Sequence, residues 1–166
     1  MSIEQLEKLF EGNIEQLADS LDGTVQAVLS DYRKLQTSGN KGHLSHVYIS
    51  FLLSGVLCEL PLLRIDLFDE NDKSDITECC AYWDVPCISS ALYSDIDAMK
   101  KNRMQDYEIE QTWFDDSSNY SQCFERFLPQ IIERCEAVKE LNCQWHFGQY
   151  LGVTTVVRER KTDEIL

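Results

Sequence analysis

The sequence predicts an α+β fold in which helices pack against one face of a mostly antiparallel sheet. Apolar residues recur every three or four positions near both ends of the chain, as on an amphipathic helix. Between these regions apolar and polar residues alternate, as in a strand. The 166 residues have the length of one domain, so we expect a single domain over 1–166. Its predicted parts are helical residues 1–38, a β meander over 44–86, helices with an acidic connection over 94–141, and a strand over 145–160.

The N-terminal part is predicted to be helical over residues 1–36, where apolar positions run at helical spacing from Ile3 to Leu35. Gly12 and Gly23 interrupt good helix formers, and each costs about 1 kcal/mol in a helix interior. Because Asp22, Gly23 and Thr24 offer both a helix stop and a new cap, we expect one break there.

The middle of the chain is predicted to form three strands. Residues 46–53 are rich in β-branched and aromatic side chains, and residues 76–85 form a third such segment. Between them, residues 62–69 alternate so that Leu63, Ile65 and Leu67 face one way, which suits a strand with one buried face. Consecutive strands with short connections favour an antiparallel meander.

The C-terminal part is predicted to contain a short helix over 94–103 and a long amphipathic helix over 120–141. Pro129 either kinks this long helix or marks its true start. Residues 105–122 are ambiguous, because Tyr107, Ile109 and Gln111 alternate with acids as in a strand. A final strand over 145–160 closes the chain.

The segments Tyr48–Leu52, Leu63–Glu70 and Glu78–Asp84 resemble a pattern found in uncharacterised small proteins of Gram-positive bacteria. The resemblance covers about residues 46–84 and implies a bacterial origin. It implies no activity and assigns no role to any residue.

The net charge of −14 argues against a surface that binds nucleic acid or an anionic membrane, since both require a basic footprint. The N-terminus lacks the basic start and apolar run of an export signal, and no apolar run is long enough to span a bilayer. The seven cysteines are odd in number and form no CxxC pair. We therefore expect free thiols and a cytoplasmic protein.

The acidic charge is concentrated in two stretches, residues 66–84 and 104–125, which together carry −12 of the −14. Both stretches also contain aromatic residues, and acids with aromatics suit a contact with a partner that presents Lys and Arg. If the stretches meet in space, they form a strong negative field. The alternative is a solvated acidic surface over an aromatic core. The residues predicted to bind a partner are Asp66, Asp69, Glu70, Asp72, Asp75, Trp83, Asp84, Asp106, Glu108, Glu110, Trp113, Asp115 and Asp116.

No motif in the sequence indicates a metal or a catalytic centre. The loop after residue 69 fails as an EF-hand, because Lys73, Ser74 and Cys80 occupy positions that need a ligand, a glycine and a glutamate. Neighbouring Cys79 and Cys80 point to opposite faces of a strand. No serine or cysteine lies in a nucleophile elbow. We expect no catalytic residue, no cofactor and no metal.

Two functions of different classes are consistent with these observations. The first is a binding protein that neutralises or sequesters a basic protein partner, in general character like the immunity proteins that block a toxin or nuclease domain through charge mimicry. The second is a small enzyme or ligand-binding domain with a pocket between the sheet and the C-terminal helix, with polar groups from His46, Tyr48, Arg64 and Asp66. An adaptor or a subunit of a larger assembly is a third alternative.

Overall fold

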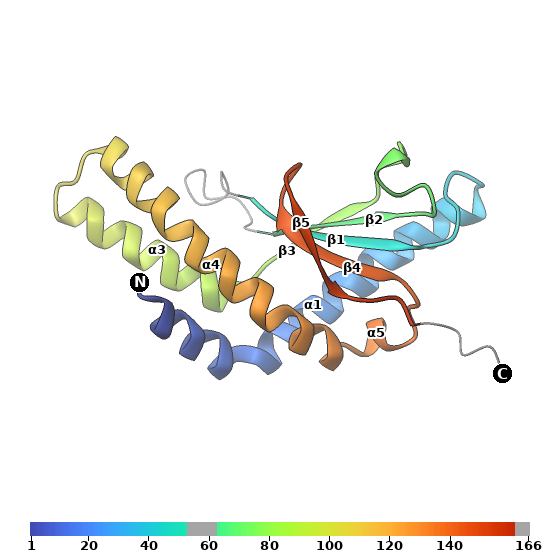
Figure 1. Ribbon diagram of the computed structural model, residues 1–166, viewed down its shortest axis with the longest axis horizontal. Coiled ribbons are helices and arrows are strands. Elements are labelled where there is room, and N and C mark those ends of the chain that lie inside the picture. The colour runs from blue at the N-terminus through green and yellow to red at the C-terminus, as the bar shows by residue number, and fades with distance from the viewer. Residues whose placement is uncertain (53–62, 162–166) are drawn as a thin grey trace.

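The structure is a computed structural model that describes residues 1–52 and 63–161 (Figure 1). These residues form an α+β fold of helices and a five-stranded sheet. The elements in chain order are α1 (Ile3–Thr37), β1 (His46–Phe51), β2 (Leu63–Phe68), the short 3₁₀ helix η1 (Asp72–Ser74), β3 (Cys80–Trp83), α3 (Pro86–Lys101), α4 (Asp106–Arg134), α5 (Glu136–Lys139), β4 (Gln144–Gln149) and β5 (Thr154–Arg158).

The sheet has the strand order β3-β2-β1-β4-β5. Strands β1, β2 and β3 form the predicted meander, since each is antiparallel to the next. The sheet as a whole is mixed rather than mostly antiparallel, because β4 lies parallel to β1 and β5 runs antiparallel to β4. The chain passes through α3 and α4 before it returns beside β1, and a connection of that length permits parallel pairing. The predicted final strand is therefore a pair of strands.

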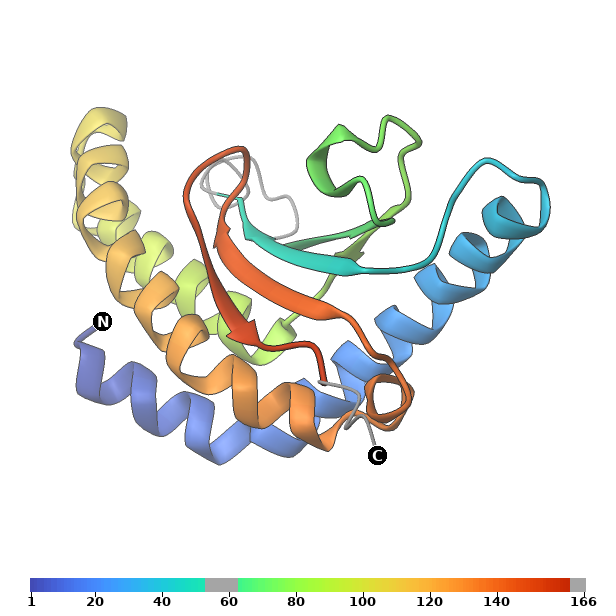
Figure 2. The same cartoon turned by 45° about the vertical axis from the view of Figure 1, so that its right-hand side comes forward.

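Helix α1 is continuous over residues 3–37, so the predicted break at Asp22 is wrong. The helix bends near its middle instead (Figure 2). Buried residues on both sides of Gly23, such as Leu21 and Val25, hold the two halves against the core. The Asp22 carboxylate accepts a hydrogen bond from the backbone N–H of Ala137 at 2.7 Å and so caps α5.

The helices after β3 also differ from the prediction. Helix α3 begins at Pro86 rather than residue 94, and the ambiguous residues 105–122 belong to α4. These residues form a helix despite their strand-like alternation, because Ile109, Trp113 and Tyr120 then lie on one buried face of α4. Pro129 lies inside α4 and does not mark its start. The longest helix is therefore the N-terminal α1, not a C-terminal one.

The core lies between the sheet and the helices, which cover one face of the sheet (Figure 2). Buried Val47 and Ile49 of β1 are in register with Trp145 and Phe147 of β4 and therefore share this face. The opposite face of the sheet is open between the β4–β5 hairpin and the loop that contains η1 (Figure 2). We call this the open face.

Candidate functional site

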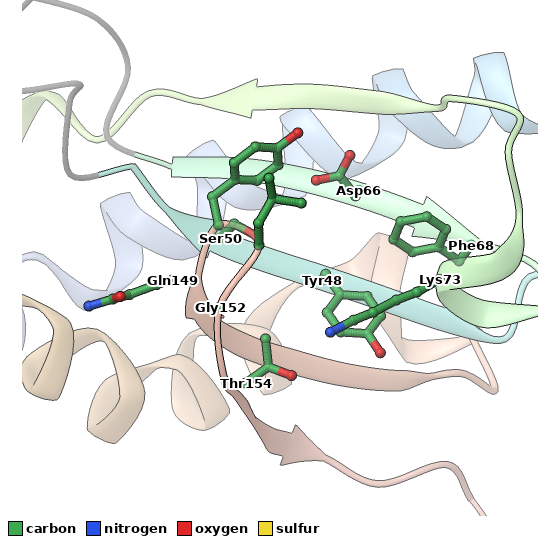
Figure 3. A pocket seen from close by; sticks show the side chains of 10 residues that line it. Tyr48, Ser50, Asp66, Phe68, Lys73, Gln149, Gly152 and Thr154 are labelled. Carbon is green, nitrogen blue, oxygen red and sulfur yellow. The ribbon is translucent and has the colours of Figure 1, made fainter.

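The open face carries a pocket with a volume of about 240 Å³ (Figure 3). Its floor comes from alternate residues of neighbouring strands, because the side chains that do not face the core point here. These floor residues are Tyr48 and Ser50 of β1, Asp66 and Phe68 of β2, and Thr154 of β5. The pocket therefore lies on the opposite side of the sheet from the site that the sequence predicted between sheet and helix.

The tip of the β4–β5 hairpin forms one wall of the pocket through Tyr150, Leu151 and Gly152. The hairpin folds tightly over Gly148, where a Cβ atom would lie 2.2 Å from the carbonyl oxygen of Val153. Leu151 has a φ of 58° and is 90% exposed, while Val153 is 88% exposed. The tip thus presents two aliphatic side chains to solvent.

Lys73 of η1 forms the opposite wall, and its ammonium lies 4.8 Å from the centre of the Tyr48 ring. Figure 3 shows the Lys73 side chain extending across this ring. The Tyr48 hydroxyl donates a hydrogen bond of 2.9 Å to Asp72. Burial, together with this bond, raises the pKa of Tyr48, so its hydroxyl stays protonated at neutral pH.

Arg64 and Asp66 form a bidentate ion pair beside the pocket, with N···O distances of 2.7 to 3.0 Å. Arg64 also pairs with Glu78 at 2.7 Å and lies 5.1 Å from the centre of the Tyr150 ring. The bond to Asp66 is the main reason that the pKa of Arg64 is raised, and the bond from Arg64 lowers the pKa of Glu78. The charge of Asp66 is therefore neutralised within the protein.

A histidine pair lies next to Tyr48. The Nδ1 atom of His46 is 3.3 Å from the Nε2 atom of His146. The His146 ring stacks on Tyr48 at 4.2 Å with an angle of 5° between the planes. Burial and the neighbouring His46 lower the pKa of His146, so its ring is neutral at pH 7.

The thiols offer no activated nucleophile among the described residues. The six described cysteines are free, and Cys58 lies outside the described residues. Burial raises the pKa of each of the six thiols, which leaves them protonated at neutral pH. Within residues 1–52 and 63–161, no group of three or more His, Cys, Asp or Glu residues is placed to hold a metal ion.

Most carboxylates of the first acidic stretch form hydrogen bonds or ion pairs within the protein. Asp75 forms a buried ion pair with Lys41, and Asp69 accepts hydrogen bonds from the backbone N–H groups of Gly42 and Asn71. Although burial opposes it, these bonds lower the pKa of Asp69. Glu70 accepts from the backbone N–H of His43 at 2.7 Å. Asp84 is exposed at the end of β3.

The second acidic stretch lies on the first half of α4. Asp106, Glu110 and Asp115 are exposed, whereas the Glu108 side chain accepts a hydrogen bond from the backbone N–H of Gln105 and so caps the helix. Asp116 lies 3.7 Å from the amino group of Met1.

The structure does not bring the two acidic stretches together. In both views the β4–β5 hairpin lies between the loop around η1 and the first half of α4 (Figures 1 and 2). Trp83 and Trp113 are buried in the core, and the indole N–H of Trp83 donates to Ser20 at 2.8 Å. We therefore no longer expect either tryptophan to contact a partner.

Sequence reasoning missed several residues of the pocket. It considered Tyr48 and Asp66 as polar groups of a pocket, and both line it. It did not find Ser50, Lys73, Thr154 or the hairpin tip. No local signal marks them, because they meet only through the pairing of β1 with β4 and of β4 with β5.

Comparisons of this chain with models of protein families, with curated proteins and with solved structures found no match. A search of the described helices found none with the length and apolar character needed to cross a membrane.

Proposed function

We propose that this chain is a cytoplasmic binding protein that holds a basic protein partner on the open face of its sheet. One observation supports this most directly: Leu151 and Val153 are nearly fully exposed at the tip of the β4–β5 hairpin, which forms one wall of the pocket. Aliphatic side chains gathered at one exposed site are typical of a protein contact.

The charge of the chain supports a basic partner. A net charge of −14 accelerates the approach of a positively charged protein and repels acidic ones. Glu70 and Glu78 lie in the loop that borders the open face, and both stay exposed while they bond to His43 and Arg64. Negative charge and the aliphatic hairpin tip therefore occur on the same side of the molecule. A toxic nuclease domain is a partner with the required basic surface, and its neutralisation would make this an immunity-like protein.

The proposal is tested with the full chain as bait in a lysate of its own host, with captured proteins identified by mass spectrometry. The double variant L151D/V153D places two charges at the hairpin tip, where both side chains are exposed and folding is not expected to suffer. We expect the wild type to retain a basic protein that the variant loses, and rising salt to weaken the retention.

The matched control is D115N/D116N, which removes two charges from the first half of α4. We expect this variant to retain the same basic protein with only slightly weaker binding. Charges outside the buried contact affect mainly the rate at which the two proteins associate. Equal capture by wild type and L151D/V153D would contradict the proposed face. Loss of capture in D115N/D116N alone would move the contact to α4.

A second candidate is a small enzyme or ligand-binding domain. The observation that favours it is the contact between His46 and His146 beside the pocket, with Tyr48 stacked on His146. A neutral histidine such as His146 near a pocket can exchange a proton with a bound molecule. Binding of a small molecule to the pocket would support this candidate.

A further inference from the structure

We propose that the pocket on the open face binds a small organic anion, a carboxylate attached to a flat aromatic body. This inference concerns a small-molecule ligand, and it does not depend on the proposed protein partner. It follows from a serine hydroxyl and a lysine ammonium that have no hydrogen-bond or ion-pair partner among residues 1–52 and 63–161, and from the aromatic walls.

Two hydroxyl groups face the pocket from one row across three strands. Ser50 of β1 is in register with Gly148 of β4, and Gly148 is in register with Thr154 of β5. Because Gly148 has no side chain, the backbone of Val153 and Thr154 packs closely over it in this row. Ser50 is only 5% exposed, and its hydroxyl forms no hydrogen bond with another described residue. A buried hydroxyl in a pocket is expected to have a partner, and a ligand oxygen would supply one.

Of the two charged side chains that line the pocket, Asp66 and Lys73, only Lys73 has no ion pair with a described residue. Asp66 is paired with Arg64. Asp72 does not line the pocket, and it keeps its negative charge while it accepts the hydrogen bond of Tyr48. The ammonium of Lys73 has the Tyr48 ring beneath it and no ion pair among the described residues. A carboxylate is the group that pairs with an ammonium and also accepts hydrogen bonds from hydroxyls.

The walls of the pocket suit a flat apolar body. Tyr48, Phe68 and Tyr150 line it, and the rings of Tyr48 and Phe68 meet edge to face at 5.5 Å. The volume of about 240 Å³ lies below the range of roughly 300 to 1,000 Å³ typical of drug-sized ligands. A single aromatic ring with a carboxylate and one further polar group is of a suitable size.

The acidic surface of the protein does not prevent this binding. Charges farther than about 8 Å apart are largely screened at physiological ionic strength. The exposed carboxylates in the first half of α4, Asp106, Glu110 and Asp115, lie on the other side of the β4–β5 hairpin from the loop around η1 (Figure 1). A bound carboxylate would be attracted by Lys73 and by the two hydroxyls, and Asp72 beside Lys73 would oppose part of this attraction.

The test is a titration of the ¹⁵N-labelled full chain followed by NMR. The probes are benzoate, phenylacetate and 4-hydroxybenzoate, with 4-hydroxybenzamide as a neutral molecule of the same shape. We expect at least one carboxylate to shift the backbone amides of Ser50, Lys73 and Thr154. That carboxylate should bind about tenfold more tightly than the amide, as expected for one charge-assisted contact.

Two variants and one control complete the test. Lys73→Gln should reduce the affinity for the carboxylate to that for the amide, and Ser50→Ala should reduce it about threefold to tenfold through one lost hydrogen bond. Lys8→Gln, an exposed change on α1, should leave it unchanged. Equal binding of carboxylate and amide, unchanged affinity in Lys73→Gln, or no shift with any probe would each overturn the proposal. None of these results bears on capture of a protein partner, which is read out with the hairpin variant.

Discussion

The loop around η1 and the first half of α4 are both rich in acidic residues, but their carboxylates differ in burial and in hydrogen bonding. In the loop, Asp69 and Asp75 are buried and accept hydrogen bonds or an ion pair from distant parts of the chain. On α4, Asp106, Glu110 and Asp115 are exposed, and Asp115 accepts a bond from Gln111 on the same helix. Similar charge density therefore does not imply a similar role.

The difference arises from the backbone around each carboxylate. A helix satisfies its own N–H groups, so the acids on its surface are left to solvent. The loop has N–H groups without backbone partners, and its Asp side chains supply the acceptors. The acidity of the loop is thus part of its structure, while that of α4 acts mainly on solubility and long-range attraction.

The largest expected effect is that of Asp75→Asn. The change leaves the ammonium of Lys41 buried without its counter-ion, and removing one partner of a buried pair costs about 3 to 5 kcal/mol. The free energy of unfolding in urea measures this loss. The same replacement at exposed Asp115 should change it by less than about 0.5 kcal/mol. Equal losses in the two variants would show that the two regions do not differ as described.

A smaller effect is expected for Asp69→Ala, which removes the acceptor for the N–H groups of Gly42 and Asn71. The loss should be about 1 to 3 kcal/mol at neutral pH. Because the pKa of Asp69 is lowered by folding, its contribution is present above the ordinary aspartate pKa of about 3.9 and is lost as the pH falls through the lower folded value. The variant should therefore lose less stability on acidification than the wild type. Parallel acid profiles of the two proteins would contradict this assignment.

The smallest pH effect is expected at the histidine pair. Folding lowers the pKa of His146, so the unfolded chain binds a proton that the folded one does not. Stability should fall as the pH drops below about 6.5, the ordinary histidine value, until the folded value is passed. His146→Gln should reduce this dependence between about pH 7 and 5 in urea unfolding curves. His43→Gln, an exposed control, should leave the profile unchanged.

The elements most readily predicted from the sequence were those with a clear local period. The alternation of Leu63, Ile65 and Leu67 correctly indicated β2 and its buried face. The meander followed from short connections. Gly23 misled the prediction for α1, since a propensity cost of about 1 kcal/mol is outweighed by buried side chains on both sides of it.

The candidate site was less predictable, because it depends on pairing between distant segments. Tyr48 and Asp66 could be recognised as polar groups of one strand face. Their neighbours Thr154 and His146 come from strands about 100 residues later, and nothing local indicates that β4 lies parallel to β1. Lys73 reaches the pocket because the loop around η1 folds over the sheet, and no pattern in the sequence predicts that conformation of the loop.

The insertion of β4 beside β1 has a consequence for the synthesis of this protein. His46 pairs with Gln144, so one edge of β1 has no strand partner until nearly the whole chain has been translated. At about 5 to 20 residues per second, this interval lasts roughly 5 to 20 seconds. During that time the nascent meander presents unpaired backbone groups and an apolar face to other chains. The long helix α1, which is made first, is available from the start to cover that apolar face.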